Sequence, residues 1–242
     1  MPALYDRIGD GYAGLRRADP RIAAQLVAAL GPPAPLLNLG AGTGNYEPED
    51  RWVVAVEPSV EMIRQRPARA APAVRAVAQA LPFAEGAFEA GLAVLTVHHW
   101  PDPIAGLREL RRVVRGRIVI LTFDPAARPW LTDYIPGLAA LDEAQMPALD
   151  VYEAALGPVR ITPLAIPHDC TDGFLYAYWR RPEAYLDPRL RSGSSSFRAL
   201  ADAGRGLERL REDLANGAWD RRHGALRDRD SYDAGYRLIE TA

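Results

Sequence analysis

The chain has 242 residues, 48% of them hydrophobic, and a formal net charge of −2, so it can bury a substantial core. Cys170 is its only cysteine, which excludes an intramolecular disulfide. The arginine-rich region 198–229 is interleaved with acids, which favours a solvated surface over a nucleic-acid groove. Because we find no apolar leader and no run long enough to span a bilayer, we expect a cytoplasmic protein without a membrane partner.

The first predicted element is a helix over residues 5–30, where Ile22, Leu26 and Leu30 recur at four-residue spacing before Gly31. The hydrophobic period then changes, and short apolar runs alternate with helical stretches. These runs, the predicted strands, are 35–39, 51–56, 73–77, 90–97, 117–123, 159–166 and 235–241. The clearest intervening helix is 104–114. This alternation predicts an α/β fold with a doubly wound, mostly parallel seven-stranded sheet.

Two regions exceed what a minimal α/β unit needs. Residues 124–150 are rich in proline and aromatics, and residues 168–231 contain a serine cluster and two predicted helices. Helical insertions after the fifth and sixth strands are where such a fold acquires a substrate pocket. No linker marks a boundary, so we expect a single domain. Its core would be about 30–125, 155–167 and 232–242, and its cover segments about 1–29, 124–150 and 168–231.

The stretch Leu36–Tyr46, LLNLGAGTGNY, is a glycine-rich loop directly after a predicted strand. A phosphate-binding P-loop requires a lysine, and the chain has none. A dinucleotide fingerprint requires a third glycine where Asn45 stands. The spacing is Gly-x-Gly-x-Gly, which differs from both patterns.

This loop, followed by VVAVEPS, resembles the class I S-adenosylmethionine-dependent methyltransferases of type 11. The similarity continues through QALPFAEGAFEAGLAVLTVHHWPD and LRELRRVVRGRIVILTFDP, so it extends from about Tyr5 to Pro125. The resemblance implies a Rossmann-like fold, S-adenosylmethionine as cofactor and S-adenosylhomocysteine as product. It further implies a monomer or homodimer that methylates oxygen or nitrogen of a small molecule. A nicotinamide-dependent oxidoreductase and a non-catalytic S-adenosylmethionine-binding protein are the alternatives.

The resemblance also implies cofactor contacts. In the family the glycine loop passes under the methionine part of the cofactor, and the acid after the second strand, here Glu57, holds the ribose hydroxyls. Tyr12 and Arg16 match a Tyr-x-x-x-Arg pattern that covers the cofactor, with a surface ion pair as the alternative for Arg16. The family's acid near adenine is replaced by Val77, so Gln79 is the expected acceptor. The other expected contacts are Gly40, Ala41, Gly42, Asn45, Pro58, Met62, Ala78, Leu81 and Thr96.

The acceptor side is predicted from chemistry and position. His98 follows the fourth strand, at the edge where ligands bind in open α/β sheets, and imidazole suits proton transfer near neutral pH. We therefore expect His98 to act as a general base, with packing of both histidines beside Trp100 as the alternative. Expected acceptor contacts are His99, Trp130, Tyr134, His168 and Asp169. No spacing among the histidines and acids predicts a metal site.

Overall fold

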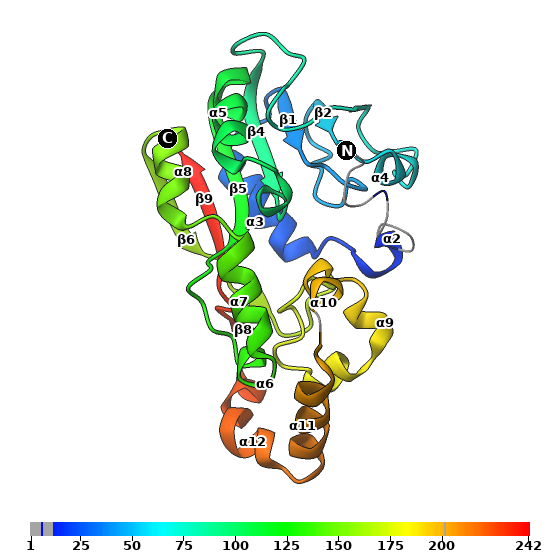
Figure 1. Ribbon diagram of the computed structural model, residues 1–242. Coiled ribbons are helices and arrows are strands. Elements are labelled where there is room, and N and C mark those ends of the chain that lie inside the picture. Colours follow the sequence, from blue (N-terminus) through cyan, green and yellow to red (C-terminus); the bar gives the residue numbers. More distant parts are fainter. Residues whose placement is uncertain (1–5, 7–11, 201) are drawn as a thin grey trace.

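The computed structural model describes residue 6, residues 12–200 and residues 202–242 (Figure 1). Its centre is a seven-stranded sheet with the order β3-β2-β1-β4-β5-β9-β6. The strands are β1 Leu36–Leu39, β2 Val53–Val56, β3 Ala73–Val74, β4 Phe88–Val94, β5 Val114–Phe123, β6 Val159–Pro163 and β9 Tyr236–Thr241. Neighbours from β3 to β5 are parallel, and β9 is antiparallel to β5 and β6. The predicted α/β class and mostly parallel seven-stranded sheet are confirmed.

Helices cover both faces of this sheet, so each face has its own core. On one face, Ile22 and Leu26 of α3 (Pro20–Leu30) pack against Leu36 of β1. On the other, Leu107 of α5 (Pro103–Val113) and Tyr152 of α8 (Leu149–Leu156) pack in a second cluster. Because the central strands are buried on both faces, they are apolar apart from Asn38 of β1, and the predicted strands are easily recognised.

The expected helix over residues 5–30 is interrupted, because the described part forms α2 (Tyr12–Leu15) and α3 with a break at residues 16–19. Pro20 restricts the preceding residue to extended backbone, and Asp19 has φ −79° and ψ 125°. The Asp19 carboxylate then caps α3 by accepting from the amide of Arg21 at 3.0 Å. This break is functionally relevant, because it allows Arg16 to leave the helix and reach a distant turn.

Several predicted strands are shorter than expected, and the strand over 73–77 keeps only Ala73–Val74. The strand over 90–97 ends at Val94, because Leu95 adopts φ +50° and the chain enters a 3₁₀ helix, η1 (Val97–His99). The strand over 159–166 ends at Pro163. Its last residues join a separate two-stranded ladder, in which β7 (Ile166–Pro167) pairs with β8 (Ser231–Tyr232).

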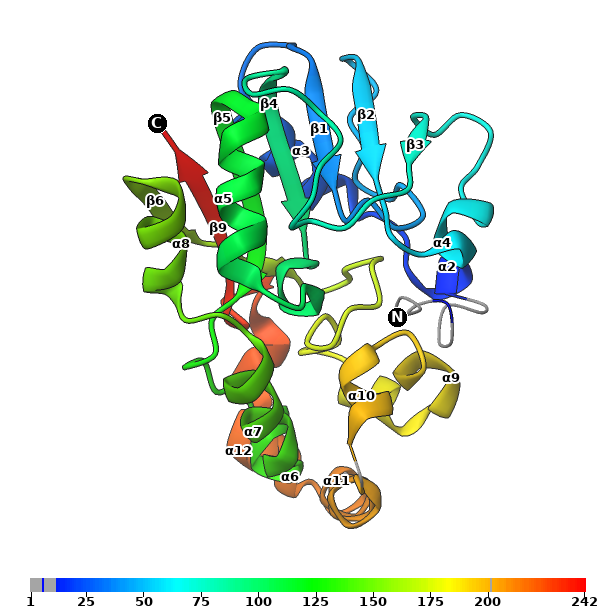
Figure 2. The same ribbon diagram turned by 45° about the horizontal axis from the view of Figure 1, so that its top comes forward.

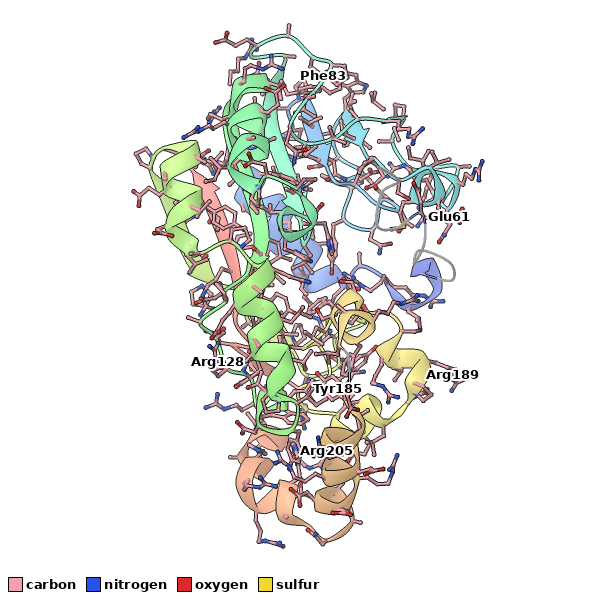
Figure 3. All side chains as sticks on the ribbon, viewed as in Figure 1. Glu61, Phe83, Arg128, Tyr185, Arg189 and Arg205 are labelled. Atoms are coloured by element: carbon pink, nitrogen blue, oxygen red, sulfur yellow. The ribbon has the colours of Figure 1, made fainter. Side chains whose placement is uncertain are left out.

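The regions after β5 and β7 form a second layer below the sheet (Figures 1 and 2). It contains α6 Leu131–Tyr134, α7 Pro136–Gln145, η2 Pro182–Leu186, α9 Pro188–Arg191, α10 Ser195–Ala199, α11 Gly204–Ala215, α12 Ala218–His223 and η3 Gly224–Asp228. Figure 2 shows that the carboxyl ends of the parallel strands point toward this layer. Tyr185 lies inside it, whereas Arg128 and Arg189 lie on its outside (Figure 3). No described helix is both long and apolar enough to cross a bilayer.

Candidate cofactor and acceptor site

A cavity of about 860 Å³ opens at the carboxyl ends of β1, β2 and β4. The loops after these strands form most of its wall, which explains why residues far apart in the sequence meet there. Twelve of the residues expected at the ligands line it, namely Arg16, Gly40, Ala41, Gly42, Asn45, Glu57, Pro58, Met62, Ala78, Gln79, Thr96 and His99. Sequence reasoning missed Thr43, Tyr46, Arg75, Leu95 and Trp100, which also line it.

The glycine loop wraps closely around the end of β4. Gly40 has φ +69°, and a side chain there would place its Cβ 2.0 Å from Oγ1 of Thr96. The amides of Gly40 and Ala41 both donate to the carbonyl of Val56, at 2.8 and 3.0 Å. Only glycine allows this backbone conformation and this close approach together, so the loop keeps its backbone exposed along the cavity.

Glu57 directly follows β2 and is a buried carboxylate, with 5% of its surface exposed. One oxygen accepts from the amide of Gly42 at 2.8 Å and the other from the amide of Ser59 at 2.9 Å. Burial raises the pKa of the Glu57 carboxyl, and these two amide bonds oppose that shift. Each oxygen retains acceptor capacity toward the cavity, so Glu57 can accept hydrogens from two neighbouring hydroxyl groups.

A buried ion pair supports the loop from behind. Arg66 donates through Nη1 to the carbonyl of Gly42 at 3.0 Å and through Nη2 to Glu47 at 2.5 Å. Glu47 also accepts from the amide of Ala71 at 3.0 Å and from Nδ2 of Asn38 at 3.2 Å. Glu47 thus supplies a buried carboxylate beside Asn38 of β1.

The opposite end of the cavity is less polar. The side chain of Val77 is 47% exposed, and Ala78 is buried beside Trp100. The Gln79 side chain lines the cavity, and its Nε2 lies 3.5 Å from the carbonyl of Asp102. Leu81 is an expected cofactor contact, but it does not line the cavity. Its side chain packs instead in the apolar cluster that contains Leu107 of α5.

The N-terminal segment closes one side of the cavity. Arg16 lines the wall, but its guanidinium binds Asp172, with Nη2 3.2 Å from Oδ2. Tyr46 donates to the same carboxylate at 3.0 Å. The ion pair is largely buried and is not the surface pair given as the alternative. The side chain of Tyr12 lies outside the described residues.

A second cavity of about 50 Å³ adjoins the first, and the two share Arg16, Leu95 and His99. His98 lines only this smaller cavity, and its ring lies 3.9 Å from that of His99. Burial, the neighbouring His99 and the Arg16 charge hold the pKa of His98 well below its usual value. Burial and the Arg16 charge lower the pKa of His99 to about 4. Both imidazoles are therefore neutral near pH 7.

Four expected acceptor contacts lie outside both cavities, which corrects their predicted place. Trp130 fills the core of the second layer, where its indole donates to the carbonyl of Trp179 at 2.9 Å. Tyr134 donates to Asp213 at 2.9 Å. His168 and Asp169 lie at the surface, and Asp169 pairs with Arg21. Aromatic content alone could not separate core residues from cavity residues, because both are apolar.

Comparisons with known proteins agree with this geometry. Residues 37–120 match the methyltransferase domain family of type 11. Demethylmenaquinone methyltransferase of Mycolicibacterium vanbaalenii is 36% identical over 121 residues, which are 47% of this chain and 53% of that protein. The corresponding protein of Mycolicibacterium paratuberculosis is 35% identical over 109 residues, 43% of this chain and 47% of that protein. The chain thus spans about half the length of these curated relatives.

Two solved structures extend the likeness to nearly the whole chain. One, from Anabaena variabilis and assigned as a methyltransferase of an antibiotic biosynthesis pathway, is 35% identical with a TM-score of 0.86. The match covers 94% of this chain and 99% of that one. An S-adenosylmethionine-dependent methyltransferase from Thermotoga maritima shares the fold, at 14% identity and a TM-score of 0.59, over 98% of this chain and 96% of that one. The chain belongs to the class I S-adenosylmethionine-dependent methyltransferases.

The residues of the larger cavity fit the family's cofactor, S-adenosylmethionine. Its volume of about 860 Å³ is within the range of small-molecule sites. Glu57 offers acceptors for two ribose hydroxyls. Oγ1 of Thr43 is buried on this wall without a hydrogen-bond partner among the described residues, so a ligand can complete its bonding.

Proposed function

We propose that this protein transfers the methyl group of S-adenosylmethionine to oxygen or nitrogen of a small-molecule acceptor. The observation that carries the proposal is the junction of the two cavities at Arg16, Leu95 and His99. One cavity has the family's cofactor loop as its wall, and the smaller one is enclosed by the second layer. The curated relatives are named for demethylmenaquinone as the molecule they methylate, which supports a small-molecule acceptor.

The cover role of the second layer is part of this proposal. Asp142 and Met146 from segment 124–150 line the smaller cavity together with Phe174 and Ser195 from segment 168–231. Leu95 at the junction is the one non-glycine residue with a positive φ among those described. Backbone strain of this kind persists where surrounding structure requires it, commonly at functional sites. Both segments would exclude water from the acceptor and orient it toward the junction.

When bound, S-adenosylmethionine supplies an electrophilic methyl group on a sulfonium. The chain's task is then to hold the acceptor atom in line and to accept the proton that the acceptor loses. We propose that His98 accepts this proton, since its neutral ring lines the smaller cavity. Because its pKa is lowered, His98 is a weak base, so positioning contributes more than proton transfer.

Differential scanning and turnover test the proposal. S-adenosylhomocysteine should raise the melting temperature and NAD should not, since a ligand that binds only the folded state stabilises it. Incubation with S-adenosylmethionine and a set of phenols and amines should yield methylated product by mass spectrometry. His98→Asn should keep S-adenosylhomocysteine affinity and lower the rate by no more than about a hundredfold, the lower end of general-base effects, because the pKa of His98 is depressed. Stabilisation by NAD alone would favour an oxidoreductase, and binding without turnover a non-catalytic protein.

A further inference from the structure

The smaller cavity contains a buried carboxylate that the proposed reaction does not use. Asp142 lies on α7 and is 2% exposed. Its side chain lines the cavity, and Tyr176 donates to Oδ2 at 2.6 Å. Among the residues that the structure describes, Tyr176 is the one group that donates to this carboxylate. Oδ1 therefore keeps its full acceptor capacity.

A carboxylate in this place is unfavourable for the empty protein. Burial raises the pKa of Asp142 to about 6, although the bond from Tyr176 and the charge of Arg128 oppose the shift. Arg128 does not form an ion pair with Asp142, because its guanidinium pairs with the exposed Glu143. A structural bond to Tyr176 alone would need only a neutral acceptor such as an amide. A charged group with one free oxygen is suited to a ligand that donates a hydrogen bond.

The walls around Asp142 are aromatic and come from three parts of the fold. Phe123 at the end of β5 stacks on Tyr176 with centroids 5.0 Å apart. Phe174 meets Tyr236 of β9 edge to face at 4.7 Å. All four rings line the same cavity as Asp142. Flat aromatic walls favour a flat aromatic occupant, because rings stack and meet edge to face at these distances.

We propose that Asp142 binds a hydroxyl or amino group of an aromatic acceptor, and that this group is not the one that is methylated. The inference rests on the proposed methyltransferase function. The cavity of about 50 Å³ admits this substituent and the leading edge of the ring. The rest of the ring then extends to Leu95 and His99, where the larger cavity begins. The acceptor class is thus an aromatic ring with two polar substituents, of which Asp142 selects one.

The test is an NMR titration of the S-adenosylhomocysteine-saturated protein with catechol, resorcinol, hydroquinone and their three amino analogues. Phenol is the matched probe that lacks the second donor. At least one two-donor ring should bind about tenfold more tightly than phenol. Asp142→Asn should abolish this preference while leaving S-adenosylhomocysteine affinity unchanged. Glu143→Gln, which changes the adjacent charge outside the cavity, should preserve the preference.

The proposal is overturned if no two-donor ring exceeds phenol, or if the preference survives in Asp142→Asn. If that variant unfolds, the wild-type protein still tests the proposal, because the bound ring must give NOE contacts with Phe174 or Tyr176. Absence of those contacts also overturns it. Failure of S-adenosylhomocysteine to bind would instead contradict the proposed function itself, so the two failures are distinguishable.

Discussion

Arg16 and Asp172 are 156 residues apart in the chain, yet the guanidinium of one contacts the carboxylate of the other at two points. The Asp172 side chain is fully buried, and that of Arg16 is 11% exposed. Since Arg16 also lines both cavities, this pair fixes the N-terminal segment against the candidate site.

Asp172→Asn should therefore lower the free energy of unfolding by about 3–5 kcal/mol, because it removes the buried carboxylate charge that Arg16 contacts at two points. Urea denaturation measures this loss. Asp169→Asn in the same turn is the control, since its exposed pair with Arg21 should contribute little to stability. Equal losses of stability in the two variants would show that burial does not make the Arg16–Asp172 pair more stabilising than the exposed Arg21–Asp169 pair.

A second prediction concerns the support of the glycine loop. Arg66→Gln removes the charged donor to the carbonyl of Gly42, so the loop should be less well held and S-adenosylhomocysteine affinity should fall about tenfold. Isothermal calorimetry measures the affinity. Arg64→Gln changes an exposed arginine at the end of α4 (Val60–Arg64), two positions before Arg66, and should leave the affinity unchanged. Unchanged affinity in Arg66→Gln would mean that the loop keeps its shape without this bond.

A third prediction separates crowding from backbone strain. Gly40→Ala should combine the strain of a positive φ with a collision against Thr96, destabilising the fold by about 2–5 kcal/mol and abolishing cofactor binding. Gly157→Ala is the matched variant, because φ is +84° there and nothing lies within 4 Å of the added Cβ. It should lose only about 1–2 kcal/mol. Similar losses in thermal denaturation would refute the close approach to Thr96.

A fourth prediction follows from the lowered pKa of His99. As pH falls from about 6.5 to 4, the unfolded chain takes up a proton that the folded site excludes. This imidazole should therefore reduce the free energy of unfolding by on the order of 3 kcal/mol over that range. The raised pKa of Asp142 acts in the opposite direction, so wild type must be compared with His99→Gln. If both proteins lose the same stability on acidification, His99 is not the source.

The sequence predicted the parts of the fold and site that depend on local pattern. Continuous apolar runs identified the buried strands, and glycine spacing with an acid after the second strand placed Gly40 and Glu57 at one cavity. Asp142 gave no such signal, because an acid within a helix normally lies in solvent. Its burial depends on how α7 packs against Tyr176, which is a tertiary contact.

The position of a residue after a strand predicted less completely whether its side chain lines a cavity. Two adjacent histidines after β4 could be placed near the site, but the turn at Leu95 decided that His98 lines the smaller cavity and His99 both. Trp130 and Tyr134 matched the composition of a pocket wall and instead fill the second layer. Glu47 beside Asn38 could not be anticipated, since nine residues separate them and only the loop's fold brings them together.

We infer that the cavity at β1, β2 and β4 binds the cofactor through Glu57. The most direct test is calorimetric titration of S-adenosylhomocysteine into wild type and Glu57→Gln, with the exposed Glu49→Gln as the charge control. Loss of the carboxylate should weaken binding by on the order of 2–4 kcal/mol in Glu57→Gln, because charge-assisted hydrogen bonds to the ribose are lost. Glu49→Gln should match wild type. Equal affinity in all three proteins would show that Glu57 does not hold the cofactor.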